Sequence, residues 1–346
     1  MSNPTTGAGP DGRGFGPLAR ARGLLLRQDT ILLIVLVAMI VIFTVMNPRF
    51  LSVPSFANIL QDWAPVMLLA IGQTYVIITS GIDLSVGSTL GLTGVSAALI
   101  IRGLTESGAS PAVAISLGVV AALAVGALVG LINGLLVTRI NLAPFIATLA
   151  TMGVGAGMTL VLTRGVQIAG GPREVIAIGT TKLFGLLTAT LIITIVVLII
   201  AWAVLQMTRF GRWTYAIGSN SFAARGAGIN VNRHLIKVYI FSGVMAAMAG
   251  LFVYFRLGSG SPTSGAGFEL NAIAAVVIGG SSLVGGSGKM SGTLLGALIT
   301  TAVLSGLILI GVQPYWQEVV VGVLIALAVG IQQLGNSRGR KGRKHG

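Results

Sequence analysis

The sequence has 346 residues but no cysteine, only two histidines and few charged side chains. Without cysteine the chain cannot form a disulfide framework, a thiolate metal site or a cysteine nucleophile. His234 and His345 stand far apart, one at a loop edge and one near the end of the chain. A histidine-rich metal site or a Ser-His-Asp triad within a membrane is therefore excluded.

Charged residues make up 9% of the chain, whereas a soluble domain carries about 25% to cover its surface. Hydrophobic residues make up 54%, and the mean hydropathy is +0.94. Glycine, at 50 residues, is about twice as frequent as usual, which suits close contact between helices in a bilayer. The composition excludes an ordinary soluble protein and predicts an all-α, polytopic membrane protein.

A phosphate-binding loop is also missing. The nearest match, Gly288-Lys289, fails because Leu283 stands where the loop needs its first glycine and Met290 where it needs Ser or Thr for the metal. The sequence therefore predicts no catalytic residue, no metal site and no cofactor bound by this chain, so it does not predict an enzyme.

The net charge of +14 could indicate nucleic acid, because basic proteins bind phosphates. Ten of the 22 basic residues, however, lie in two short segments, 209–237 and 338–344, each beside a long apolar run. This distribution is typical of charges that set membrane topology. We therefore expect membrane lipid, and no nucleic acid, as a partner.

Ten segments are apolar enough to be membrane spans, for which a helix needs about 20 residues. The second and eighth are short and end at glycines, so broken or re-entrant helices are expected there. Residues 1–29 are expected to be a disordered, basic cytoplasmic tail that is retained, not cleaved as a signal peptide, and residues 335–346 a second basic tail. The ten segments are Thr30–Met46, Ala64–Thr79, Leu84–Ile101, Pro111–Leu136, Pro144–Leu162, Leu183–Leu205, Leu235–Phe255, Asn271–Val284, Met290–Val312 and Trp316–Ile331.

With ten spans, both termini share one side of the membrane, and the basic residues indicate which side it is. Sixteen basic residues fall on the side of the termini and six on the other, so both termini are predicted to be cytoplasmic. The loop 207–234 is the only sizeable hydrophilic loop on that side, and 163–182 is the longest on the other. Neither has room for a soluble domain.

Asp83 is the one acidic candidate at the depth of the spans. It could cap a helix that begins at Leu84, or contact a solute at a break between two half-helices. Uncharged polar residues could line a solute route or bond neighbouring helices. The candidates for the route are Gln73, Asp83, Ser85, Ser88, Asn133 and Asn271, and Thr74, Thr89, Thr148 and Thr151 are further polar residues at depth.

Small residues at four-residue spacing predict close contact between helices. A weak internal repeat accompanies them, at an offset of 199 residues, and hints at duplicated helix breaks. The spaced glycines are Gly87 and Gly91, Gly126, Gly130 and Gly134, Gly153 and Gly157, and Gly292 and Gly296; the repeat pairs Gly81, Leu84, Gly87 and Ser88 with Gly280, Leu283, Gly286 and Ser287.

The loop 207–234 contains a segment that can form a short helix. Ser219 or Asn220 can cap it, and Gly226 or Gly228 can end it. Such a helix could dock in a groove of another protein, or it could be a solvated connector.

At this loop the sequence resembles a known family, the ribose-type carbohydrate ABC importer permeases. The resemblance extends over roughly residues 47–334. One departure is Ser221-Phe222, where the commoner form of the family has Pro-Glu or a similar acidic pair. The similar stretches are Phe210-Gly211-Arg212, Tyr215-Ala216-Ile217-Gly218-Ser219-Asn220, Ala223-Ala224-Arg225 and Gly228-Ile229 in the loop, then Gly81-Ile82-Asp83-Leu84-Ser85-Val86-Gly87-Ser88, and Ile278-Gly279-Gly280-Ser281-Ser282-Leu283 with Gly285-Gly286-Ser287-Gly288.

The resemblance implies that residues 30–334 are the transmembrane domain of a bacterial importer of the cytoplasmic membrane, with 207–234 as its coupling loop. It implies three protein partners: a second permease, either another copy or a paralogue, an ABC ATPase that uses ATP and Mg, and a periplasmic-type sugar-binding protein. The residues it assigns to ATPase coupling are Gly218, Asn220, Ala223, Ala224, Arg225, Gly228 and Ile229.

A neutral sugar or polyol is the substrate that fits best, because no charged residue demands an ionic one. The alternative is a secondary transporter or channel for a small neutral solute that works alone. Transporters driven by protons or voltage generally need ionisable groups at depth, which this chain nearly lacks.

Overall fold

The structure is a computed structural model that describes the main chain of residues 28–183 and 187–342, and side chains up to residue 330. Helices dominate the described chain. Two two-residue strands, β1 (Lys182–Leu183) and β2 (Leu187–Thr188), pair antiparallel. The helices are α2 (Gln28–Met46), the 3₁₀ helix η1 (Pro48–Leu51), α3 (Val53–Ile78), α4 (Val86–Glu106), α5 (Pro111–Thr138), α6 (Pro144–Thr163), α7 (Arg173–Thr180), α8 (Ala189–Met207), α9 (Arg209–Ser219), α10 (Ser221–Gly226), α11 (Val231–Leu257), α12 (Phe268–Ile278), α13 (Met290–Leu309) and α14 (Pro314–Gly342).

Each of the ten expected spans overlaps one helix, which confirms an all-α, polytopic fold. Seven helices of the described chain, namely α2, α4, α5, α6, α8, α11 and α13, are long and apolar enough to cross a membrane. The apolar helix α12 and the apolar part of α14 are shorter. The helix α3 is as long as the seven, but it carries Gln61, Asp62 and Gln73 and is largely buried among other helices.

Four helices differ most from the expected spans. The second span is not short, because α3 extends over Val53–Ile78. The eighth span ends early, since α12 stops at Ile278 before the glycine-rich loop, and α8 begins six residues later than expected. The main chain of α14 is helical to Gly342 and so includes most of the segment expected to be a tail; the expected tail of residues 1–29 lies almost wholly outside the described residues.

Local sequence explains several helix starts. Ser110 accepts a hydrogen bond from the amide of Val113 and precedes Pro111, which suits the first turn of α5. Asn220 accepts from the amide of Ala223 at 2.9 Å and starts α10, which confirms the short helix expected in the loop. The structure adds α9, an amphipathic helix that the sequence reading treated as loop.

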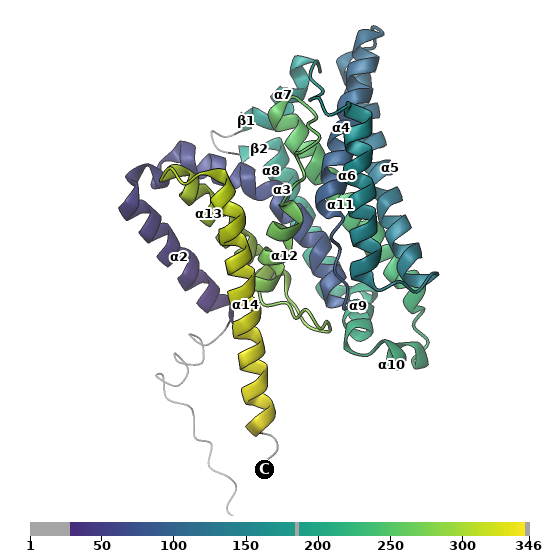
Figure 1. The fold of residues 1–346 in the computed structure, drawn as a ribbon, viewed down its shortest axis with the longest axis vertical. Coiled ribbons are helices and arrows are strands. Elements are labelled where there is room, and N and C mark those ends of the chain that lie inside the picture. The colour runs from purple at the N-terminus through teal and green to yellow at the C-terminus, as the bar shows by residue number, and fades with distance from the viewer. Residues whose placement is uncertain (1–27, 184–186, 343–346) are drawn as a thin grey trace, which may run out of the picture.

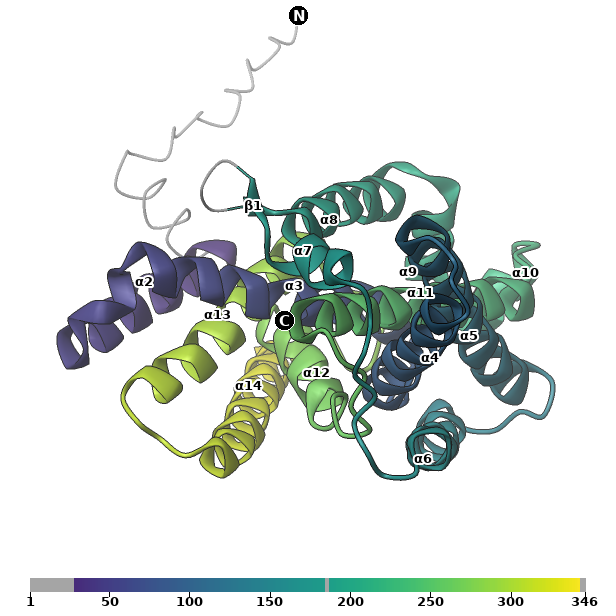
Figure 2. The same ribbon diagram turned by 90° about the horizontal axis from the view of Figure 1, so that it is seen from above.

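The helices form two groups on either side of α3 (Figures 1 and 2). One group, which we call the packed half, contains α4, α5, α6 and α11. The other, the cavity half, contains α12, α13 and α14 with the adjoining face of α3; α2 lies outside it against α13. In Figure 1, α9 and α10 lie at the lower end of the molecule and α7 with the strands at the upper end. We call these the connector end and the mouth end.

Close glycine contacts hold the packed half together. A Cβ added to Gly126 would lie 2.4 Å from the carbonyl oxygen of Gly243, and one added to Gly130 would lie 2.2 Å from that of Tyr239, so α5 and α11 touch through their backbones. In the cavity half Gly296 of α13 meets α12 in the same way. Gly153 and Gly157, at the same spacing on α6, meet no atom of the described chain within 4 Å. The predicted role of the spaced glycines therefore holds for some helices and not for α6.

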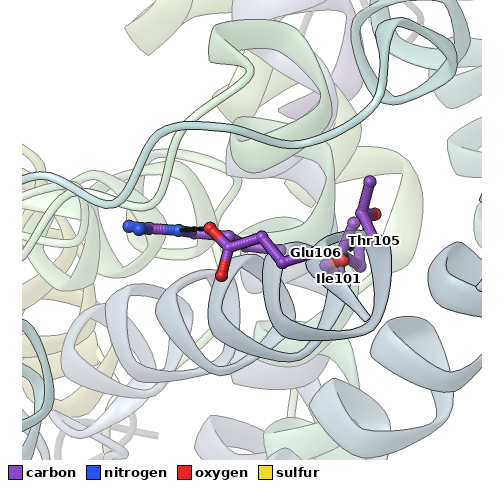
Figure 3. A network of polar contacts seen from close by, with 4 residues as sticks. Ile101, Thr105 and Glu106 are labelled. Carbon is purple, nitrogen blue, oxygen red and sulfur yellow. Dashed lines mark hydrogen bonds and ion pairs between the residues drawn. The ribbon is translucent and has the colours of Figure 1, made fainter. Parts of the chain in front are cut away.

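An exposed ion pair marks the mouth end of α4 (Figure 3). The Nε of Arg102 lies 2.7 Å from the Oε1 of Glu106, one helical turn further along, and Thr105 bonds the carbonyl of Ile101. Both charged side chains are about half exposed, so the pair contributes little to stability. Charged groups in water fit a helix end that has left the hydrocarbon.

Candidate functional site

A cavity of about 530 Å³ opens among α3, α11, α12, α13 and α14, with Gly179 and Thr190 from the mouth-end segments at its edge. Its wall combines apolar side chains such as Phe252 and Leu304 with many uncharged polar ones. This mixture is typical of small-molecule sites. The polar uncharged residues on the wall are Gln61, Thr190, Ser264, Asn271, Thr301, Ser305 and Gln317.

The charges on the cavity wall are few and partly neutralise each other. Arg256 of α11 donates to Asp62 of α3 and forms an ion pair with it, and Glu318 of α14 is the remaining charged residue of the wall. Thr301 is almost fully buried, and its hydroxyl has no hydrogen-bond partner among the described residues. The wall therefore offers donors and acceptors without a strong net charge.

Gln73 lies deeper along α3 and is completely buried. Neither its amide nitrogen nor its carbonyl oxygen bonds any described atom. It follows Asp62 by eleven residues and Val66 by seven, spacings that place all three on one face of the helix. Both Asp62 and Val66 line the cavity, so Gln73 continues the cavity face of α3 towards the connector end.

The other predicted route residues lie elsewhere, in the packed half. The carboxylate of Asp83 accepts from the amide and hydroxyl of Ser85, at 3.0 and 2.6 Å, and from the hydroxyl of Ser242, at 2.8 Å. Asn133 donates to the Ser85 hydroxyl and accepts from Thr151. These bonds join the α3–α4 loop to α5, α6 and α11 and use the polar atoms within the protein.

Two details of that network correct the sequence reading. Asp83 does not cap a helix that begins at Leu84, because α4 begins at Val86 and Asp83 instead bonds the main chain of Ser85 within the loop. Ser88 donates to the carbonyl of Ser85 at 3.0 Å, within its own chain segment. Of the six predicted route residues, only Asn271 lines the cavity.

At the connector end three segments meet: the end of α3 with residues 79–85, the C-terminal part of α9, and the glycine-rich loop 279–289. The amide of Gly286 donates to the carbonyl of Ile78 at 2.9 Å. The hydroxyl of Ser80 lies within hydrogen-bond distance of the carbonyls of Gly218 and Val284. We call this meeting point the connector junction; it links α9 directly to the helices of the cavity half.

Tyr215 of α9 makes a further bond in the junction. Its hydroxyl donates to the carbonyl of Gly288 at 2.8 Å. Burial raises the pKa of the phenol, more than its hydrogen bond with Gln206 lowers it, so the group stays protonated and remains a donor. Gly218 must be glycine here, because an added Cβ would lie 1.7 Å from the Ile78 carbonyl.

The predicted coupling residues fall into two sets. Gly218 and Ala224 face the protein: Gly218 contacts α3, and Ala224 is buried in a small core with Ile217 and Val231. Ile229 packs against that core, and Gly228 has a φ of +83° in the turn that ends α10. The exposed set is Asn220, Ala223 and Arg225, of which Arg225 reaches the Asn232 side chain at 3.4 Å.

The repeat at an offset of 199 residues joins two segments that touch. The loop with Gly81 and the loop with Gly280 both follow a helix that ends at the connector end, and the Ser80, Val284 and Gly286 contacts bring them together. Ser80 itself has a φ of +64°, uncommon for a residue with a side chain. The repeat hinted at duplicated helix breaks but did not predict this contact, and the roles of Ser80 and Tyr215 were missed.

Apart from Asn271, the residues of the cavity wall were not predicted from the sequence. Asp62 and Arg256 are separated by 194 residues, and nothing in their sequence neighbourhoods links them. Gln61 and Asp62 were a usable signal, because polar residues in a long buried helix need protein or solute around them.

The chain is similar to several known proteins. The family profile described as branched-chain amino acid transport system / permease component matches residues 55–329. The ribose import permease protein RbsC of Escherichia coli (strain K12) is 45% identical over 301 residues, 86% of this chain and 91% of the relative. RbsC of Bacillus subtilis (strain 168) is 43% identical over 299 residues, 84% and 88% of the two chains. The galactose/methyl galactoside import permease protein MglC of Haemophilus influenzae is 36% identical over 324 residues, 90% and 95%. No solved structure matches the chain.

Proposed function

The chain belongs to the ribose-type permeases of bacterial ABC importers, and from this premise we propose that it moves a neutral sugar or polyol across the cytoplasmic membrane. It is a multi-pass protein of that membrane and a subunit for sugar import. The ribose-like substrate, the subunit arrangement and the route are the parts that we propose.

The cavity among α3, α11, α12, α13 and α14 is the observation that carries the proposal. Its wall presents amide and hydroxyl groups, including Asn271 and the hydroxyl of Thr301, which has no partner among the described residues. Sugar hydroxyls can donate to and accept from such groups. The ion pair of Asp62 with Arg256 pairs two of the three charged residues of the wall, so the wall has no cluster of like charges for an ionic solute. A cavity of this volume and polarity suits a small hydroxylated molecule.

Gln73 extends the proposed route inward. A buried amide without a partner is costly, and a passing sugar offers hydroxyls that can pair with it. We therefore place Asn271 and Thr301 at an outer solute-binding position, nearer the mouth end, and Gln73 at an inner one, nearer the connector end. The earlier candidates Asp83, Ser85, Ser88 and Asn133 hold the packed half together in this proposal and do not contact the solute.

The energy for transport would be supplied by a partner protein at the connector end. We propose that an ABC ATPase, which binds the ATP and Mg, contacts α10 and moves it together with α9. Because α9 bonds the α3–α4 loop and the glycine-rich loop through Gly218 and Tyr215, its displacement reaches α3, α12 and α13 as a rigid-body motion. This motion would open and close the cavity, and the connector end would face the cytoplasm.

Two further partners complete the proposal: a second permease, identical or paralogous, and a periplasmic-type binding protein that delivers sugar to the mouth end. This chain itself would bind no cofactor. The rival hypothesis is a secondary transporter or channel that works alone. The two hypotheses differ in whether uptake depends on ATP and on the partners.

Reconstitution tests the proposal. The chain would be purified with its ATPase and binding protein and placed in proteoliposomes, and uptake of radiolabelled ribose, galactose and ribitol would be measured with ATP on the ATPase side. We expect ATP-dependent uptake of one neutral compound and none with a non-hydrolysable ATP analogue. Uptake by this chain alone, without ATP, would instead establish the stand-alone transporter or channel, and exclusive uptake of an ionic solute would contradict the substrate class.

A further inference from the structure

Phe222 is the most exposed large hydrophobic side chain of the described residues outside the apolar spans, with 87% of its surface in solvent. It lies on α10, at the connector end (Figure 1). An aromatic ring held in water at the tip of a protein is a typical anchor for a partner.

The backbone beneath Phe222 is held firmly. Asn220 caps α10, and Ala224 is buried against Ile217 and Val231 on the inner face of the helix. Phe222 precedes Ala224 by two residues, which is about 200° around a helix, so burial of one exposes the other. The ring is therefore presented by a fixed backbone, which lowers the entropy lost when it binds.

The sequence segment that carries Phe222 is basic. Between residues 207 and 237 the sequence has five basic residues and no acidic one. All five are exposed, and they are Arg209, Arg212, Arg225, Arg233 and Lys237. A complementary surface would be apolar at its centre and acidic at its rim.

We propose that Phe222 is the anchor residue of the ATPase contact, inserted into an apolar pocket with acidic residues around it. This rests on the proposed function and adds the chemistry of the partner. The alternative occupant is the lipid surface, which also attracts aromatic and basic groups. The ATPase is favoured because α10 is joined through α9 to the connector junction, where an applied displacement reaches the cavity half.

The test measures the dissociation constant of the ATPase for the full-length permease in nanodiscs. Phe222→Ala should weaken binding about 30-fold, as expected for a central aromatic anchor, whereas Phe222→Leu should stay within about threefold because it keeps an apolar side chain of similar reach. The matched control is Ser221→Ala, which removes an exposed hydroxyl at the adjacent position and should leave binding unchanged. Added salt should weaken wild-type binding, because the basic rim is screened.

Each outcome separates the hypotheses. Unchanged binding by Phe222→Ala would overturn the anchor role, while ATP-driven uptake by the wild type would leave the proposed function standing. A loss that occurs only in nanodiscs with anionic lipid, and not with neutral lipid, would assign Phe222 to the membrane surface and also overturn the proposal. If the wild type does not bind the ATPase at all, the proposed function itself fails.

Discussion

The packed half and the cavity half contain the same kinds of polar residue but use them differently. In the packed half, Asn133 and Asp83 each bond partners on other segments, and glycines bring α5 and α11 into backbone contact. In the cavity half, Gln73 and Thr301 are buried without a partner among the described residues. Polar groups that bond each other stabilise a fold, whereas unpaired ones are available to a solute. The difference teaches that the residue type alone does not reveal a transport route.

The largest expected effect comes from disrupting the packed half. Gly130→Leu should destabilise the protein by more than about 3 kcal/mol, because the new side chain would meet the main chain of Tyr239 and Ile240, which cannot move aside. We expect little or no folded protein by size-exclusion chromatography in detergent.

Gly153→Leu is the matched control. It makes the same glycine-to-leucine change at a glycine with the same four-residue spacing, on α6, but no described atom lies within 4 Å of the added Cβ. Folded protein should be recovered at the wild-type level. Equal recovery of both variants would show that the α5–α11 backbone contact is not what holds the packed half.

The second prediction compares two asparagines. Asn133→Leu should lower the free energy of unfolding by about 1–3 kcal/mol, because it removes the two hydrogen bonds that join the α3–α4 loop, α5 and α6. Asn271→Leu should change stability by less than about 0.5 kcal/mol but reduce the rate of sugar uptake about tenfold, the loss expected for one hydrogen bond of about 1.4 kcal/mol to the solute.

Thermal unfolding in detergent and uptake into proteoliposomes measure the two effects separately. The distinction between the two halves fails if Asn133→Leu unfolds like the wild type but takes up sugar slowly, while Asn271→Leu is destabilised but takes up sugar at the wild-type rate. In that case the route would pass through the packed half, and Asp83 would regain its role as a candidate contact for the solute.

The spans were predictable because apolar runs of sufficient length have few alternatives to helices in a membrane. The helix α10 was predictable from Asn220 and the glycines that follow it. The full length of α3 was not, because Gln61 and Asp62 interrupt its apolar run. The helix tolerates them because its neighbours are other helices and a cavity, not lipid.

The candidate site was predictable only in part. The coupling segment has a continuous motif, so its residues could be named, although their inward or outward direction could not. The cavity wall comes from helices far apart in the chain, and Asn133 and Asn271 look equivalent in the sequence. What separates them is the tertiary neighbourhood: Thr151 and Ser85 for Asn133, and an open volume for Asn271.

The smallest effect on stability, and the sharpest test of the comparison, is expected at Gln73. Gln73→Leu should leave the protein as stable as the wild type or raise the free energy of unfolding by about 1 kcal/mol, because a buried amide with no partner among the described residues is replaced by an apolar side chain of similar size. Uptake should nevertheless fall. The control is Thr74→Val, which removes the 2.8 Å bond to Thr293 of α13 and should cost about 0.6 kcal/mol. A clear loss of stability in Gln73→Leu would mean that the amide is bonded in the membrane, and the distinction between the two halves would then rest on the cavity alone.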